Sequence, residues 1–268
     1  MTEDIEDIVS EWEKESFRHP IFGERMPSYV IDDMWESGSA TYSDSRYSVI
    51  KDGIVDAMID GGILLPDDTV LDIGSGPGTF AIPMSGHCRS VLCVDKSPGM
   101  LRRITEAGID NISVLNSDCF ELSKDYKRDL AFSSLCPPMN NPAGIDLMGR
   151  LGRKCVYVSS ANKESNLECR VWKELGEDYS YAGYDTDYPY RYLKAKGIDA
   201  DIRYFSQDWR SEEPCSVVQD RMVATIKRYR QVDDATIELI REVVADESED
   251  GLIRQSLNLR IGMLTWSP

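Results

Sequence analysis

The stretch "TVLDIGSGPGTFAIP", from Thr69 to Pro83, decides the fold of this 268-residue chain. A short apolar run containing Asp72 leads directly into three glycines, which are Gly74, Gly76 and Gly78. Glycine lets the backbone turn sharply, and it lets a ligand approach where any Cβ atom would intrude. The stretch therefore predicts a strand that ends in a ligand site built from bare backbone.

The pattern of an apolar run followed by a turn and a helix recurs along the chain. The predicted strands are 69–73, 90–95, 112–116, 129–134, 154–160, 200–205 and 258–268. Continuous apolar strands that alternate with helices are typical of a parallel sheet covered on both faces. Right-handed crossovers between such strands give a doubly wound α/β fold.

Composition narrows the partners that this chain can have. The net charge is −17, and so acidic a surface repels a phosphate backbone, which makes a nucleic-acid partner unexpected. No apolar run approaches the roughly 20 residues that cross a bilayer, and the N-terminus is acidic, so we expect a cytoplasmic protein without a membrane partner. Seven scattered cysteines and two histidines show no metal-ligand spacing, so no metal is expected. Small molecules, or sites on proteins, are left as partners, and the oligomeric state is open.

The residues around the glycines indicate the kind of cofactor. In open α/β sheets, ligands bind outside the carboxyl ends of the strands. Asp95 ends the second predicted strand, where its carboxylate can accept hydrogen bonds from both hydroxyls of a ribose. The dinucleotide fingerprint needs a small residue five positions after the first glycine, where this chain has Thr79. Asp72 suits a cationic cofactor better than a pyrophosphate, so the pattern favours an adenosine cofactor without phosphate.

These motifs resemble those of class I S-adenosylmethionine-dependent methyltransferases. The segments "VLDIGSGPG" and "VLCVDKSPGML" are similar to motif I and the second-strand region of that family, and "NSDCFEL" and "DLAFSSLCPP" to its third and fourth strand ends. "MWESGSATYS" is similar to an access segment of small-molecule methyltransferases, although the alanine is displaced and Ser43 replaces an acid. The resemblance covers about Trp35 to Pro268.

The resemblance implies a mostly parallel seven-stranded sheet with helices on both faces and an antiparallel last strand. It also implies an N-terminal helix and lid segment over residues 1–47, then a methyltransferase domain over 48–268 with a substrate-side insertion near 164–190. The implied cofactor is S-adenosyl-L-methionine. The residues expected to bind it are Asp72, Gly74, Ser75, Gly76, Gly78, Asp95, Lys96, Met100, Asp118, Cys119 and Ser134.

The expected function is methyl transfer to a small-molecule acceptor, with no catalytic residue assigned. A protein or RNA methyltransferase, a nicotinamide-dependent oxidoreductase and a non-catalytic cofactor-binding protein are the alternatives. Tyr42, Cys136 and Tyr188 are the candidates for the acceptor site. The tyrosine-rich segment 179–192 could form an aromatic pocket or could equally pack onto the sheet.

Overall fold

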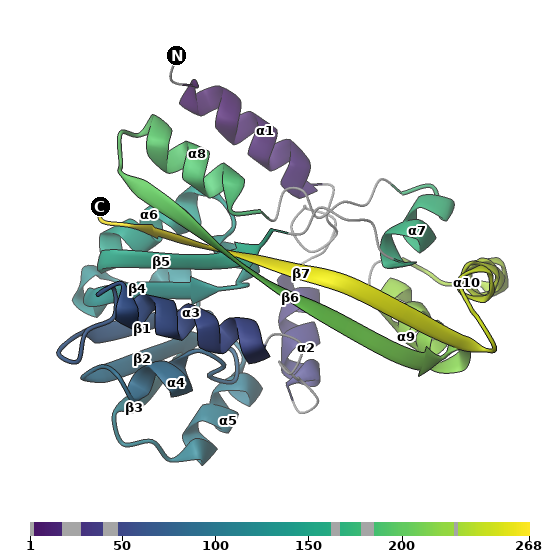
Figure 1. Cartoon of the computed structure of the whole chain (residues 1–268), viewed down its shortest axis with the longest axis horizontal. Helices are drawn as coiled ribbons and strands as arrows, with labels where there is room; N and C mark the ends of the chain where they lie inside the picture. The colour runs from purple at the N-terminus through teal and green to yellow at the C-terminus, as the bar shows by residue number, and fades with distance from the viewer. Residues whose placement is uncertain (1–2, 18–27, 40–47, 162–166, 178–184, 228–229) are drawn as a thin grey trace.

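One mixed sheet organises the molecule (Figure 1). The computed structural model describes residues 3–17, 28–39, 48–161, 167–177, 185–227 and 230–268. Within them the strands are β1 (Thr69–Ile73), β2 (Ser90–Asp95), β3 (Ile112–Asn116), β4 (Arg128–Ser134), β5 (Gly152–Ser160), β6 (Ala200–Pro214) and β7 (Leu252–Trp266). Their order is β3-β2-β1-β4-β5-β7-β6, and β7 runs antiparallel to both of its neighbours. The predicted doubly wound α/β fold is confirmed.

Helices cover both faces of this sheet. The helices are α1 (Ile5–Phe17), α2 (Ser28–Gly38), α3 (Ser48–Asp60), α4 (Ala81–Ser85), α5 (Pro98–Ala107), α6 (Pro142–Leu151), α7 (Leu167–Glu174), α8 (Asp187–Ala195), α9 (Cys215–Lys227) and α10 (Asp234–Asp246). Side chains of α3, α4 and α5 share one hydrophobic cluster with the sheet, and those of α1, α6 and α8 share a second cluster with it. The glycine loop between β1 and α4 thus lies between two packed layers. None of the described helices is both long and apolar enough to cross a membrane.

Alternation along the central strands explains why both layers form. Val70 and Leu130 face the α3–α5 layer, whereas their neighbours Leu71 and Ala131 face the α6 and α8 layer. All four are fully buried. Complete burial of a side chain such as valine or leucine stabilises the fold by about 1.5–3 kcal/mol. Two buried faces require apolar residues at every position, which is the continuous pattern seen in the sequence.

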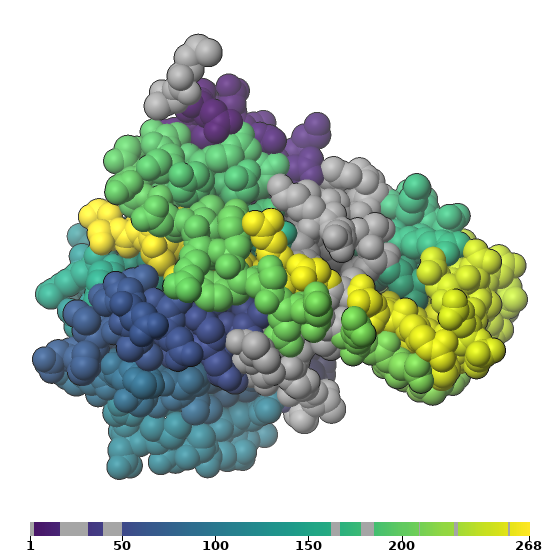
Figure 2. All heavy atoms as spheres, in the orientation of Figure 1, coloured from purple at the N-terminus to yellow at the C-terminus, as the bar shows by residue number. Residues whose placement is uncertain are grey.

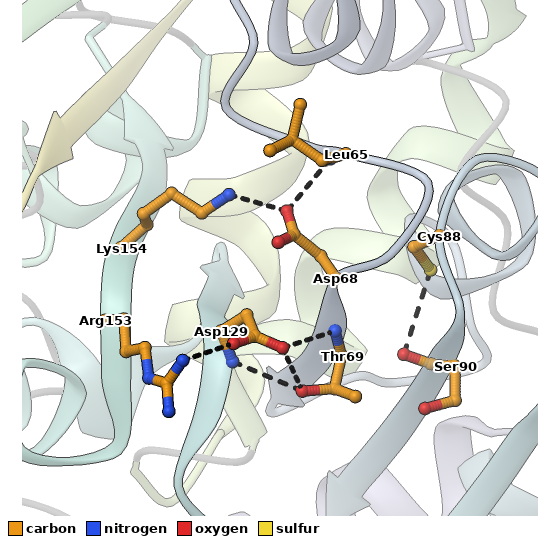
Figure 3. A network of polar contacts seen from close by, with 8 residues as sticks. All are labelled: Leu65, Asp68, Thr69, Cys88, Ser90, Asp129, Arg153 and Lys154. Atoms are coloured by element: carbon orange, nitrogen blue, oxygen red, sulfur yellow. Dashed lines mark hydrogen bonds and ion pairs between the residues drawn. The ribbon is translucent and has the colours of Figure 1, made fainter.

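A polar network joins the amino ends of β1, β4 and β5 (Figure 3). Asp68 lies 2.6 Å from Lys154 Nζ and accepts a hydrogen bond of 2.9 Å from the Leu65 amide. Asp129 accepts hydrogen bonds from the amide and hydroxyl of Thr69, at 3.0 and 2.7 Å. These hydrogen bonds, the amide bond first, lower the pKa of Asp129. The network thus fixes the relative register of three strands at the edge of the sheet opposite the glycine loop.

The two last strands are longer than the sequence indicates. The apolar patterns predict strands at 200–205 and 258–268, whereas β6 and β7 pair continuously from Ala200↔Trp266 to Pro214↔Leu252. The additional β6 residues, "SQDWRSEEP", are mostly polar because this part of the ribbon extends beyond the sheet (Figure 1). Its far end packs with α7, α9 and α10 around a separate hydrophobic cluster, and the helices α9 and α10 project at one end of the molecule (Figure 2).

The N-terminal helix packs onto the tyrosine-bearing helix α8. Trp12 is 1% exposed, and its ring stacks on Tyr188 with a centroid separation of 6.2 Å. Tyr192 also contacts Trp12 and donates a hydrogen bond to Asp146. Two tyrosines of the tyrosine-rich segment therefore belong to the core, while Tyr179, Tyr181 and Tyr184 lie outside the described residues.

Candidate functional site

The glycine loop after β1 is fastened to the end of β2. The amides of Gly74 and Ser75 both donate to the Val94 carbonyl, at 2.8 and 3.1 Å. Gly74, Gly76 and Gly78 have φ values of 69°, 54° and 85°, which fall in the left-handed region that side chains disfavour. The loop therefore turns back sharply and keeps its backbone at the carboxyl edge of the sheet.

The first and second glycines have different surroundings. A Cβ atom at Gly74 would lie 2.2 Å from Cys136 Sγ, so the absence of a side chain there permits the close approach of the loop after β4. A Cβ atom at Gly76 would meet nothing within 4 Å. Gly76 lines a cavity at this edge of the sheet, so the space beside it is open to a ligand.

Backbone amides hold the Asp95 carboxylate at the end of β2. Gly76 N donates to Oδ2 at 2.8 Å, and Ser97 N donates to Oδ1 at 2.9 Å. Burial nevertheless raises the pKa of Asp95, because desolvation outweighs the stabilisation that these amides give the charged form. Each oxygen keeps further acceptor capacity, since a carboxylate has about four lone-pair sites. Asp95 is thus a fixed pair of acceptors on the cavity wall.

Asp72 has a different environment. It is 2% exposed, and its Oδ2 atom has no hydrogen-bond partner among the described residues. Burial, with the nearby negative charge of Asp95, raises the pKa of Asp72 to about 8. A buried polar group without a partner costs free energy, and a neighbouring cation would favour the ionised carboxylate. The wall therefore has a position suited to a cationic group.

Helix α2 closes one side of the site. Glu36 accepts hydrogen bonds from Ser97 Oγ at 2.6 Å and from the Gly99 amide at 2.8 Å, which places a carboxylate at the N-terminus of α5. These bonds, the Ser97 bond first, lower the pKa of Glu36. Lys96 Nζ lies 2.9 Å from Asp32 on α2 and 3.7 Å from Asp118. The helix is thus fixed to the β2–α5 connection by two sets of polar contacts.

Asp118 also has a local structural role. Its side chain accepts a hydrogen bond of 3.0 Å from Phe120 N, which caps the short 3-10 helix η2 (Cys119–Glu121).

Leu135, directly after β4, has a φ of 47°, a conformation that leucine rarely adopts. The Leu135 amide donates to the Val158 carbonyl at 2.9 Å, which holds this turn against β5.

These elements enclose a cavity of about 390 Å³, a size suited to a small ligand. All of the residues predicted to bind the cofactor line this cavity except Gly78. A Cβ atom at Gly78 would lie 3.0–3.2 Å from Ile104 and Ile82, so its bare backbone permits packing between α4 and α5. The structure therefore brings residues from the ends of β1, β2, β3 and β4 to one wall.

The predicted acceptor residues lie in different places. Cys136 lines the cavity, but burial raises the pKa of its thiol well above the ordinary value, which keeps the sulfur protonated. Tyr188 lies in the α1–α8 core, where its hydroxyl donates to Glu11 at 3.3 Å, and it is not among the residues that line the cavity. Tyr42 is outside the described residues.

Several cavity residues were not found from the sequence. Thr79 lines the wall with a buried hydroxyl that lacks a partner among the described residues, and its position directly after Gly78 was the available signal. Asp32 and Trp35 reach the wall from α2, and Ile50, Lys51 and Ile54 reach it from α3. These residues precede the glycine loop in sequence, so only the tertiary fold brings them to it.

Comparisons with known proteins agree with this architecture. Residues 70–152 match a family described as "Methyltransferase domain", and this segment contains the glycine loop, Asp95 and Asp118. The structure superposes on magnesium protoporphyrin IX methyltransferase from Synechocystis, solved with bound SAH, with a TM-score of 0.57 and 15% identity, covering 90% of this chain and 99% of that one.

Curated relatives match the chain only in part. An uncharacterized protein of Haemophilus influenzae is 26% identical over 149 residues, which cover 53% of this chain and 55% of that protein. The 23S rRNA (uracil(1939)-C(5))-methyltransferase RlmD of Shewanella sediminis is 26% identical over 129 residues, which cover 46% of this chain and 28% of that protein. The chain thus spans about half, or less, of the length of these relatives.

The sheet order, the glycine loop and the antiparallel β7 define the fold of class I S-adenosylmethionine-dependent methyltransferases. Within it, residues 70–152 are the part of the chain that matches the family described as "Methyltransferase domain".

Proposed function

We propose that this protein binds S-adenosylmethionine in the cavity and transfers its methyl group to a small-molecule acceptor. Asp72 would pair with the ammonium group of the methionine part, and the backbone from Gly74 to Gly76 would lie along it. Asp95 would accept hydrogen bonds from the ribose hydroxyls. Asp118 and the backbone at Cys119 would meet the adenine edge, while Ser134 and Leu135 would border the sulfonium.

The buried, unpartnered Asp72 carboxylate is the observation that carries this proposal. A pyrophosphate beside it would add negative charge to a wall that already holds Asp72 and Asp95, and each of these carboxyls has a raised pKa. An ammonium group would instead favour the ionised form of Asp72 and pair with it. The donor set therefore fits a cationic nucleoside and disfavours a nicotinamide dinucleotide.

The bound donor supplies an electrophilic methyl group on a positively charged sulfur. What the chain contributes is alignment and exclusion of water, since α2 and the prolines Pro137 and Pro138 enclose the cavity. No histidine lies among the described residues that line it, and the Cys136 thiol stays protonated. An acceptor that is nucleophilic at neutral pH is thus the kind that this site suits.

The acidity of the chain supports a small acceptor over RNA. With 47 acidic and 30 basic residues, the surface repels a polyanion. RNA is the second candidate for the acceptor, because the RlmD relative is named as a 23S rRNA methyltransferase. The alignment with RlmD covers only 46% of this chain. The apolar lining beside Leu135 and Ile261 also suits a compact molecule.

The proposal is tested by measuring ligand binding through thermal unfolding, in the presence of S-adenosylhomocysteine (SAH), S-adenosylmethionine, NAD or NADP. A ligand at 100 times its dissociation constant stabilises the fold by about 2.7 kcal/mol. That gain corresponds to a rise of roughly 5–10 °C in melting temperature for a chain near this size. We expect the rise with SAH and S-adenosylmethionine, and its loss in Asp95→Ala. A rise with NAD or NADP alone would contradict the proposal.

A further inference from the structure

The two halves of the cavity differ in chemistry. At the ends of β1, β2 and β3 the wall carries the carboxylates of Asp72, Asp95 and Asp118. The other half is formed by α3 and the ends of β4, β5 and β7, and it is mostly apolar. Its lining residues include Ile50, Ile54, Leu135, Pro137, Val158 and Ile261. If the carboxylate half holds the methyl donor, as proposed above, the apolar half is left for the acceptor.

Among the described residues, one lysine lies in the apolar half of the cavity. Of the residues that the structure describes, the lysines that line the cavity are Lys96 and Lys51, and Lys96 is already paired with Asp32 and Asp118. The second, Lys51 on α3, makes no hydrogen bond or ion pair with any other residue of the described chain. In a chain with 17 more acidic than basic residues, a half-buried lysine without an acidic partner in the described part of the chain is unexpected. Its charge is available to a ligand.

The helix that carries Lys51 is held firmly against the sheet. Gln207 on β6 accepts a hydrogen bond of 3.3 Å from the Ile50 amide, next to Lys51 in the chain. One turn further, a Cβ atom at Gly53 would lie 3.6 Å from the Phe205 ring, so the helix packs closely on β6. Ile50 and Ile54 are buried in the hydrophobic cluster that α3 shares with the sheet. The lysine thus projects from a fixed position on the wall.

We propose that the acceptor is a small molecule with an apolar body and one carboxylate group, and that Lys51 binds this carboxylate. This inference rests on the proposed function for its division of the cavity. The ammonium of a lysine is a single point charge, and no arginine lies among the described lining residues to form a bidentate pair. The ionised aspartates in the other half of the cavity would repel a phosphate dianion more strongly than a monoanion.

The test uses matched pairs of small probes in the SAH complex: benzoate with benzamide, phenylacetate with phenylacetamide, and cinnamate with cinnamamide. Dissociation constants are measured by saturation-transfer NMR titration. In at least one pair we expect the carboxylate to bind about fivefold or more tightly than its amide, as one partly buried ion pair would give. We expect Lys51→Met to remove the preference and Lys51→Arg to keep it.

Controls separate this inference from the proposed function. Lys173→Met removes an exposed lysine from α7, away from the cavity, and should bind every probe as the unmodified protein does. SAH affinity in Lys51→Met should stay within about twofold, and Lys51→Gln replaces this variant if it folds poorly. Failure of SAH to bind would contradict the proposed function, and titrations without SAH would still test Lys51.

Three results would overturn the inference. The first is equal binding of the carboxylate and the amide in every pair. The second is a preference for carboxylates that survives in Lys51→Met. The third is displacement of SAH by the carboxylate probes, because it would place the anion in the donor half.

Discussion

Asp68 and Asp72 lie at opposite ends of β1 and are both buried, with exposures of 8% and 2%. Asp68 has a lysine ammonium at 2.6 Å and a backbone amide at 2.9 Å. Asp72 has an oxygen with no hydrogen-bond partner among the described residues. The carboxyl group of Asp68, directly before β1, is thus compensated at one edge of the sheet, whereas that of Asp72, within β1, is uncompensated at the other.

The difference extends to neighbouring carboxylates. At the amino edge, hydrogen bonds from Thr69 lower the pKa of Asp129. At the carboxyl edge, burial raises the pKa of Asp95 although two amides donate to it. The amino edge therefore stabilises the fold in the absence of any ligand. The carboxyl edge keeps buried carboxyl groups whose ionised form is disfavoured until a cationic ligand pairs with it, which is how a binding site differs from a structural network.

The largest expected effect is on ligand binding when Asp72 becomes asparagine. Asp72→Asn removes the charge that would pair with the donor's ammonium, and loss of a buried charge pair costs about 3 kcal/mol or more. SAH should bind roughly 100-fold more weakly by isothermal titration calorimetry. The control Asp67→Asn removes an exposed carboxylate next to β1 and should bind normally. Unchanged affinity in Asp72→Asn would remove the basis for the proposed cofactor.

The amino edge should respond in stability and not in binding. Asp68→Asn keeps an acceptor for the Leu65 amide but leaves Lys154 without its carboxylate. We expect a loss of about 2 kcal/mol, or roughly 4–8 °C in melting temperature. The SAH dissociation constant of the folded protein should stay the same. If Asp68→Asn weakened SAH binding more than Asp72→Asn, the contrast between the two edges would be wrong.

The sequence predicted most of the central fold because the information there is local. The central strands β1, β2 and β4 contain buried apolar runs, the glycines directly follow the end of β1, and Asp95 is the last residue of β2. The full length of β6 was not predictable, because residues 206–214 are mostly polar and become a strand only by pairing with β7. Strand pairing of this kind depends on long-range register, which a local pattern does not contain.

Long-range contacts also separate the predicted site from the observed cavity wall. The sequence predicts Tyr188 at the acceptor site, yet its ring stacks on Trp12, which lies 176 positions earlier in the chain. Nothing near either residue in sequence indicates that contact. Lys51 is not among the predicted site residues, because its place on the wall depends on how α3 docks against β6. The sequence therefore predicts the cavity residues that lie at strand ends, and it does not predict those that only tertiary packing brings to the cavity.

The effect of pH should sharpen the same comparison. Because the pKa of Asp72 is raised to about 8, the folded protein keeps a proton there that the unfolded chain has lost above about pH 4. Ligand-free stability should therefore fall as pH rises through this window, by at most about 1.4 kcal/mol per pH unit from this group. SAH affinity should rise over the same window, since the ionised carboxylate is the form that pairs with an ammonium.

Urea unfolding and SAH titration at pH 6, 7 and 8 test both trends. In Asp72→Asn, both the stability and the SAH affinity should change less with pH. The remaining change is expected from Asp95, whose pKa is also raised. Asp129 has the opposite sign, because its lowered pKa gives stability that is present above about pH 4 and lost on acidification. A ligand-free protein whose stability rises steadily from pH 6 to 8 would contradict the assignment of a buried, protonated Asp72.

The smallest expected effect concerns the helix that closes the carboxyl edge. Glu36→Gln keeps the size of the side chain but removes the charge that α2 places at the N-terminus of α5. Since Asp32 and Trp35 of α2 line the cavity, a looser α2 should release SAH about two- to fivefold faster, with little change in the association rate. Stopped-flow displacement measures the dissociation rate. Asp33→Asn is the matched control, because it removes the same charge from an exposed position on the same helix. If both variants release SAH at the same rate, the polar contacts of Glu36 fix α2 to the fold without holding the ligand, and closure of the site would then depend on the Asp32–Lys96 ion pair.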